Sequence, residues 1–146
     1  MSITAESKVI RWGIIGCGAV TEVKSGPAYQ KTVGFELAAV MRRDLKLASS
    51  YAQRHKVPKF SDDAAEIINN DNIDAIYIAT PPDSHKHYAL MVAKAGKPCC
   101  IEKPLASTYE ESRAIEQVFK EAKVPLFVAY YRRSLPRFNK VKHLLE

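Results

Sequence analysis

The sequence Val9-Ile10-Arg11-Trp12-Gly13-Ile14-Ile15-Gly16-Cys17-Gly18 decides the fold of this chain. Its apolar first part predicts a buried strand, and the two spaced glycines follow where that strand gives way to a helix. Glycines at this spacing permit a tight turn and a close approach of the backbone to a phosphate. The first N–H groups of the next helix point at the same anion. We therefore expect a pyrophosphate to be bound by Gly16, Cys17, Gly18, Ala19 and Val20.

The glycine loop alone is a weak signal. Thr21 stands where the third glycine of the G-x-G-x-x-G pattern is usual, and an ordinary strand-to-helix turn has the same appearance. The rest of the chain strengthens the interpretation, because apolar runs alternate with helical patterns as in a parallel α/β sheet. The runs predict strands at Val9–Ile15, Phe35–Met41, Ala75–Ala79, Pro98–Ile101 and Leu126–Tyr130, with a very short addition at Lys59-Phe60. We expect an α/β fold, a three-layer Rossmann-type doubly wound parallel sheet in a single domain over residues 1–146.

Polar residues that cap helices precede several of the helical patterns. Asp44, Ser61, and either Ser84 or Asp83 are the expected caps of three helices, and Ser107 with Glu110 forms an expected capping box for a fourth. Pro27 should kink or end the helix that follows Gly18. A final helix carries an apolar stripe that either closes on this sheet or awaits another segment, and it consists of Leu135, Phe138, Val141, Leu144 and Leu145.

Composition and charge bound the class of protein. Hydrophobic residues make up 47% of the chain and charged residues 26%, as in soluble globular domains. No apolar run approaches the roughly 20 residues of a membrane span, and the polar start lacks a signal-peptide core. We therefore expect a cytoplasmic protein without a membrane partner, and a disordered tail over residues 1–7. The three cysteines have neither zinc nor redox spacing, so no metal site is expected.

The net charge of +6 arises largely from a late basic cluster. Arg132, Arg133, Arg137, Lys140 and Lys142 belong to it. A basic balance can indicate a nucleic acid or another anionic ligand. No nucleic-acid-binding motif accompanies the cluster, so a solvated helix face is the preferred interpretation and no nucleic-acid partner is expected.

The carboxyl ends of the strands locate the candidate site, because ligands of open parallel sheets bind there. Arg42 and Arg43 follow the second strand, where NAD sites usually have an acid and NADP sites an arginine for the 2′-phosphate. A guanidinium also binds a phosphate bidentately and stacks on adenine. These residues favour NADP over NAD, although Arg43 facing solvent is an equal alternative. Asp44 is assigned to the helix cap.

Three further strand ends supply the other candidates. Thr80, Pro81 and Pro82 predict a rigid wall beside the nicotinamide, with a plain strand-to-helix connector as the alternative. His85 falls in the next helical turn, where a neutral imidazole would lie at the cofactor edge, and it ranks low as a catalyst. Lys103 is the candidate catalytic residue, since its ammonium could contact the ribose and a substrate oxygen or relay a proton. A surface lysine paired with Glu102 is an equal alternative. Glu102 itself and Tyr131 are expected to line the cofactor site.

Together these motifs resemble a known family. Gly13-Ile14-Ile15-Gly16-Cys17-Gly18, Ala79-Thr80-Pro81-Pro82 with His85, Glu102-Lys103-Pro104 and Tyr130-Tyr131-Arg132-Arg133 follow one another at the family's spacing. From about Lys8 onward the chain is similar to the N-terminal half of the glucose-fructose oxidoreductase, inositol dehydrogenase and MocA family. The resemblance implies an NAD(P)-dependent oxidoreductase of sugars, polyols, dihydrodiols or related small molecules, with Lys103 at the nicotinamide and substrate.

The resemblance also implies a second domain beyond this chain. In the family that domain supplies the rest of the substrate pocket, further catalytic residues including a histidine, and the interface of a homo-oligomer. We expect this 146-residue chain alone to be inactive. Two other classes remain open: a non-enzymatic module that binds NADP(H) to sense redox state or dock a partner, and a methyltransferase using S-adenosylmethionine. The Glu102-Lys103-Pro104 triplet and Arg42 fit a dinucleotide better than the latter.

Overall fold

The computed structural model describes residues 9–146, and the expected N-terminal tail lies outside them. Its centre is a parallel sheet with the strand order β3-β2-β1-β4-β5-β6. The strands are β1 (Ile10–Ile15), β2 (Phe35–Met41), β3 (Lys59–Ser61), β4 (Ala75–Ile78), β5 (Cys99–Ile101) and β6 (Leu126–Val128). All five pairings are parallel, as crossover helices require. The Rossmann-type sheet expected from the sequence is confirmed, and the predicted strands differ from the observed ones only at their ends.

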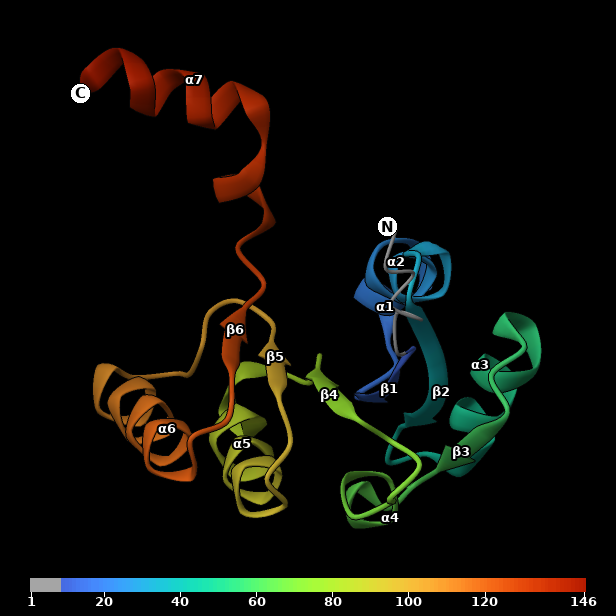
Figure 1. Cartoon of the computed structure of the whole chain (residues 1–146). Coiled ribbons are helices and arrows are strands. Elements are labelled where there is room, and N and C mark those ends of the chain that lie inside the picture. The colour runs from blue at the N-terminus through green and yellow to red at the C-terminus, as the bar shows by residue number, and fades with distance from the viewer. Residues whose placement is uncertain (1–8) are drawn as a thin grey trace, which may run out of the picture.

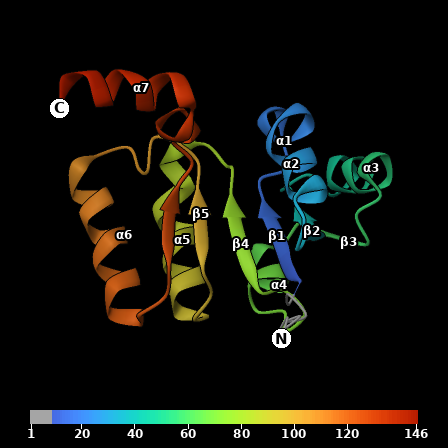
Figure 2. The same cartoon turned by 45° about the horizontal axis from the view of Figure 1, so that its top comes forward.

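Helices cover both faces of the sheet, which makes the three layers visible in Figure 1 and Figure 2. On one face, α4 (Ala64–Ile68), α5 (His85–Lys94) and α6 (Tyr109–Ala122) bury residues such as Ile67, Val92 and Phe119 against the strands. On the other face, α2 (Ser25–Lys31) and α3 (Leu45–His55) pack Tyr29 and Tyr51 on Trp12 and its neighbours. This second layer stops short of β6, where Phe127 is 57% exposed.

The first helical segment is broken into α1 (Ala19–Val23) and α2, with Lys24 between them. Pro27 has no N–H and its ring would crowd the carbonyl of Val23, so the helix cannot run through it. The break was predicted at Pro27 and falls slightly earlier. Gly26 lies against the Thr21 carbonyl and the Tyr51 hydroxyl, leaving no room for a Cβ. The same hydroxyl donates to the Thr21 carbonyl oxygen at 2.9 Å and so attaches α3 to the break.

Asp44 caps α3 as predicted, because its carboxylate accepts a hydrogen bond from the Leu47 N–H at 3.1 Å. Ser61 was the wrong cap for α4: it is the last residue of β3, and Asp63 accepts from the Ala65 N–H instead. The predicted box at the start of α6 is shifted by one residue. Thr108 accepts from the Glu111 N–H at 3.2 Å, and the Glu111 carboxylate accepts from the Ser107 N–H.

The α5 start also differs from the prediction. A short 3₁₀ helix, η1 (Pro82–Ser84), contains Asp83 and leads directly into α5. Neither Asp83 nor Ser84 caps α5 with its side chain. The Ser84 hydroxyl instead donates to Thr80 Oγ1 and the Pro81 carbonyl, at 2.9 and 2.8 Å. These contacts fix the end of β4 rather than the helix.

A second 3₁₀ helix, η2 (Tyr131–Ser134), leads into α7 (Pro136–Leu145) at the chain's C-terminal end. Both cartoons show α7 beyond the carboxyl ends of β5 and β6, lying apart from the helices on the sheet faces. Its apolar stripe is exposed, with Leu144 and Leu145 at 76% and 83%. Of the two alternatives for this stripe, closure on the chain's own sheet is therefore wrong.

Candidate functional site

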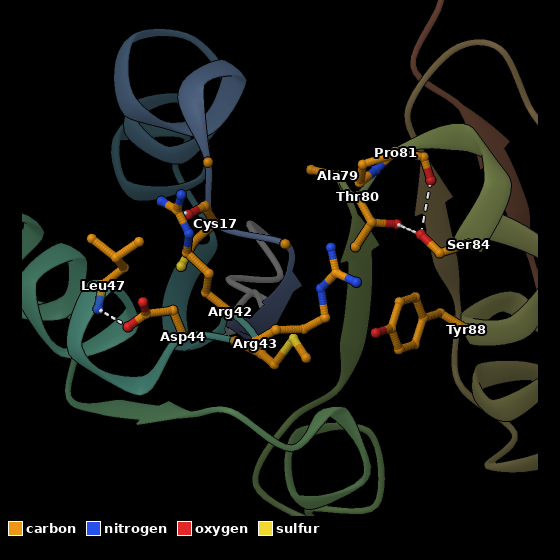
Figure 3. Close-up of a pocket in the computed structure, with 13 residues that line it drawn as sticks. Cys17, Arg42, Arg43, Asp44, Leu47, Ala79, Thr80, Pro81, Ser84 and Tyr88 are labelled. Atoms are coloured by element: carbon orange, nitrogen blue, oxygen red, sulfur yellow. Dashed lines mark hydrogen bonds between the residues drawn. The ribbon is translucent and has the colours of Figure 1, made fainter.

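The strand order creates a crevice between β1 and β4, because the segments that follow these two strands leave toward opposite faces of the sheet. A first cleft of about 410 Å³ opens at this point. The glycine loop forms one wall, the end of β2 a second, and Thr80 and Pro81 a third. Figure 3 shows these segments around the opening, with Tyr88 of α5 on the far side. The sequence expectation that the strand ends converge is confirmed.

The glycine loop is held at its place by tight backbone contacts. The N–H groups of Gly16 and Cys17 both donate to the Met41 carbonyl oxygen, at 2.9 and 3.0 Å. Gly16 has a φ of +93°, and a Cβ there would lie 2.8 Å from the Thr80 nitrogen. Gly18 is different, because a Cβ at this position would meet only the Gly16 oxygen, at 3.9 Å. Internal packing explains the first glycine but not the second, whose open side is free for a ligand.

The start of α1 presents unused donors beside Gly18. Within residues 9–146, the backbone N–H groups of Gly18, Ala19 and Val20 have no protein acceptor. The Gly18 carbonyl accepts from the Thr21 N–H and hydroxyl, at 3.1 and 2.8 Å. Thr21 therefore fixes the turn where a third glycine is usual. Free N–H groups at such a turn suit an anion.

The thiol of Cys17 takes no part in this opening. It is fully buried, and burial raises its pKa to about 11. A thiol of that pKa is protonated at neutral pH and is a poor nucleophile. Cys17 therefore lines the cleft without supplying a nucleophile.

Two arginines stand at the end of β2. Arg42 is partly buried, and its guanidinium donates to the Cys17 carbonyl oxygen at 3.4 Å. Figure 3 shows the Arg42 side chain along Cys17, whereas Arg43 extends across the opening toward Thr80 and Tyr88. Both arginines line the first cleft. Arg43 is nevertheless exposed, so its solvent-facing alternative stays open beside contact with a ligand.

His85 lies elsewhere than the sequence suggested. It is fully buried at the start of α5 and lines neither cleft. Its Nε2 lies 2.8 Å from the Thr80 carbonyl oxygen, and its Nδ1 lies 3.0 and 3.2 Å from those of Pro104 and Leu105. The imidazole thus joins the end of β4 to the segment after Lys103. Its place at a cofactor edge was an incorrect expectation, because no surface of the ring is accessible.

A second cleft of about 510 Å³ lies beyond the glycine loop, on the sheet face that α2 covers only in part. Lys103, Glu102 and Tyr131 line it as candidates from the sequence, together with Val20 from α1. The carboxylate of Glu102 accepts from the Tyr77 hydroxyl at 2.6 Å and from the Lys103 N–H at 3.1 Å. Glu102 therefore does not pair with the Lys103 ammonium, and the alternative of a surface ion pair between them is not observed.

Several lining residues were missed by the sequence analysis. Tyr88, Ser84 and Leu47 belong to the first cleft. Lys24, Tyr29 and Tyr77 belong to the second. Strand alternation could have placed Tyr77 on the face of the glycine loop, and Tyr88 follows from helical spacing after Ser84. Lys24 and Tyr29 depend on where α1 breaks, which has no clear local signal. Ala19 and Pro82, both candidates, line neither cleft.

Metal and membrane features are lacking in the part of the chain that the structure describes. No three His, Cys, Asp or Glu side chains of residues 9–146 gather as a metal site would require. Among the same residues, no helix has the length and apolar character needed to cross a membrane.

Comparison with known proteins agrees with this geometry. Residues 10–130 match the family model for GFO_IDH_MocA, described as an oxidoreductase family with an NAD-binding Rossmann fold. "Oxidoreductase P35" of Formosa agariphila is 47% identical over 137 residues, which cover 94% of this chain and 43% of the relative. The NADP(+)-dependent scyllo-inositol 2-dehydrogenase IolU of Bacillus subtilis is 32% identical, covering 92% of this chain and 40% of the relative.

A solved structure extends the similarity to three dimensions. An oxidoreductase from Agrobacterium radiobacter, in complex with NAD⁺, L-tartaric acid and magnesium, superposes with a TM-score of 0.86 at 26% identity. The match covers 94% of this chain and 40% of that one. The chain therefore spans about two fifths of the length of the relatives it matches.

Proposed function

The chain belongs to the glucose-fructose oxidoreductase, inositol dehydrogenase and MocA family as its NAD-binding Rossmann domain, and on that premise we propose that it holds NADP(H) across the two clefts. The enzyme would transfer a hydride between the nicotinamide and a sugar, polyol, dihydrodiol or related small molecule. Relatives named for such substrates support this class, including a trans-1,2-dihydrobenzene-1,2-diol dehydrogenase and an inositol 2-dehydrogenase.

The observation that carries the proposal is the path between the clefts. Gly16, Cys17 and Gly18 line the first cleft, and Val20, two residues further on, lines the second. The backbone N–H groups between them have no acceptor within residues 9–146, and Gly18 leaves its outer side open. A pyrophosphate over this turn would place one nucleoside in each cleft. The residues present therefore fit a dinucleotide.

Within this arrangement the residues have distinct roles. Arg42 and Arg43 would hold the 2′-phosphate and the adenine in the first cleft, since a guanidinium binds a phosphate and stacks on an aromatic plane. Thr80 and Pro81 wall the cleft from the β4 side. Bound NADP(H) would supply or accept the hydride. Lys103 would donate a hydrogen bond to the reacting oxygen and stabilise developing charge there.

Calorimetric titration of the chain with NADPH, NADH and S-adenosylmethionine tests the proposal. NADPH should bind more tightly than NADH, and the methyl donor should not compete. One charge-assisted pair at the 2′-phosphate contributes about 1.5–3 kcal/mol, which is about a tenfold to a hundredfold difference in affinity. Equal affinities for the two nicotinamide cofactors would remove the assignment to NADP. Preferential binding of S-adenosylmethionine would remove the proposed function.

A further inference from the structure

The rim of the second cleft carries a lysine that the proposed cofactor chemistry does not use. Lys24 is exposed in the break between α1 and α2, and it lines the cleft together with Lys103. The break arises because Pro27 stops α1, so the same local feature that ends the helix brings Lys24 to the rim. Tyr131 borders the cleft from the chain segment that follows β6.

The carboxylates nearest in sequence to these lysines are engaged elsewhere. Glu22, on α1, binds Arg54 and His55 of α3 with N–O distances of 2.7 Å. Glu102 accepts from the Tyr77 hydroxyl and from a backbone N–H. Within residues 9–146, neither the Lys24 nor the Lys103 ammonium has an ion-pair partner in the protein. The rim therefore holds uncompensated positive charge.

The phenol of Tyr131, on the same cleft, lies among further cations. Its pKa lies below the ordinary value, first because of a hydrogen bond with Arg132, and further because of the charges of Arg132, Lys24 and Arg137. A lowered pKa means that a negative oxygen is favoured at this place. The cationic groups of the α1–α2 break, η2 and α7 thus act on one region at the cleft entrance.

We propose that the substrate bound at the second cleft carries a negatively charged group, a carboxylate or a sulfate or phosphate ester, and that Lys24 recognises it. The inference rests on the proposed function, in which Lys103 faces the reacting oxygen. Two unpaired ammonium groups on one cleft can then serve two parts of one molecule. Lys103 takes the alcohol or carbonyl, and Lys24 takes the anion. A neutral sugar or polyol would leave Lys24 without a partner.

The proposal is tested by measuring how three related sugars bind to the chain. The chain is first saturated with NADPH or NADH, whichever it binds more tightly. D-glucose, D-glucuronate and D-glucose 6-sulfate differ only at one carbon, and NMR titration gives their dissociation constants. At least one of the two charged sugars should bind about ten times more tightly than glucose, as one charge-assisted hydrogen bond allows. The advantage should shrink with added salt. Whether glucuronate or glucose 6-sulfate has the lower dissociation constant shows whether the site prefers a carboxylate or a sulfate-type ester.

Two variants locate the effect. Lys24→Met should abolish the preference for the charged sugar and leave the cofactor dissociation constant unchanged. Lys31→Met, which removes an exposed lysine of α2 that lines neither cleft, should change neither quantity.

The contrary outcomes are equally distinct. Equal binding of the three sugars, or binding of none, would overturn the anionic substrate class. Weaker cofactor binding in Lys24→Met would assign this lysine to the cofactor instead. Failure of the unmutated chain to bind any nicotinamide cofactor would refute the proposed function itself, before any sugar is added.

Discussion

Arg42 is the residue on which the proposed cofactor preference depends. Arg42 follows β2, and its guanidinium donates to the Cys17 carbonyl oxygen of the glycine loop, where a bound 2′-phosphate would be within reach. Arg42→Asp should weaken NADPH binding about tenfold to a hundredfold, because a carboxylate repels the phosphate and a charge-assisted pair is lost. NADH binding should be spared. Calorimetry gives both affinities, with Lys120→Asp on α6 as a charge-matched control far in the sequence from this cleft. Parallel losses for both cofactors would show that Arg42 only supports the loop.

Lys103 should act on turnover rather than on cofactor affinity. A lysine that binds a developing alkoxide lowers the barrier without strengthening ground-state binding much. In a two-domain form that turns over substrate, Lys103→Met should reduce kcat by a factor of about a hundred. Steady-state kinetics and cofactor titration separate the two effects, with Lys94→Met at the end of α5 as the control. Weaker NADPH binding at an unchanged kcat would make Lys103 a cofactor contact only.

The sequence predicted the places of site residues that the backbone alone determines more accurately than the places of residues that depend on side-chain packing. Gly16, Gly18 and Thr80 follow directly from strand ends in a parallel sheet, and the structure brings them together. His85 was misplaced because an imidazole at the start of a helix has the same local sequence whether it faces a ligand or the interior. Only the contact with the Pro104 carbonyl, far along the chain, decides between the two.

Between elements, Glu22 joins α1 to α3 through Arg54 and His55. The Arg54 hydrogen bond, supported by that of His55, lowers the pKa of Glu22 from 4.5 to about 2. A carboxyl whose pKa is lower in the folded chain stabilises the fold above its unfolded pKa, and the effect is lost as the pH falls through its folded pKa. Because Glu22 and its partners are partly exposed, we expect them to contribute about 1 kcal/mol to the free energy of unfolding at neutral pH.

Denaturant unfolding of the unmutated chain and of Glu22→Gln, measured from about pH 2 to neutral pH, gives the contribution of this carboxylate to the free energy of unfolding. The difference in unfolding free energy should be full above about pH 4.5 and vanish near pH 2. Glu116→Gln is the control, because Glu116 pairs with Arg113 within a single exposed helix. A difference that does not change with pH would contradict the stated linkage.

The ends of helices were harder to predict from the sequence than the cores of strands. Strand cores were predictable because buried apolar runs leave little choice, and β2 agrees residue for residue. The residue that caps a helix was harder to predict, because two neighbouring polar residues can each accept the hydrogen bond from the first turn. Ser61 continues β3 by pairing with Met41, so the cap passes to Asp63. In the pair Ser107-Thr108, only the three-dimensional course of the chain decides that Thr108 precedes the helix.

Both clefts open at the carboxyl ends of the strands, and side chains of the second remain exposed. Its walls come from α1, α2, the strands and the segments that follow β5 and β6. Lys103 is exposed there, and Tyr131 is 58% exposed. In both cartoons α7 extends away from α1 and α2 rather than over them. Hydride transfer requires a carbon held within about 3–3.5 Å of the nicotinamide and shielded from water. The described residues supply one wall of such a pocket.

We therefore expect this chain by itself to bind a nicotinamide cofactor without turning over substrate. The relatives it matches are more than twice as long, since the chain covers 43% of the Formosa oxidoreductase. The measurement mixes the chain with NADP⁺ or NADPH and with sugars, polyols, dihydrodiols and their carbonyl forms, and follows the absorbance of the reduced nicotinamide. Calorimetry on the same sample confirms that cofactor is bound, so that an inactive preparation is recognised. Substrate-dependent turnover at about 1–1,000 per second, the range of ordinary enzymes, would show that one wall suffices. Lys103 and its neighbours would then form a complete active site.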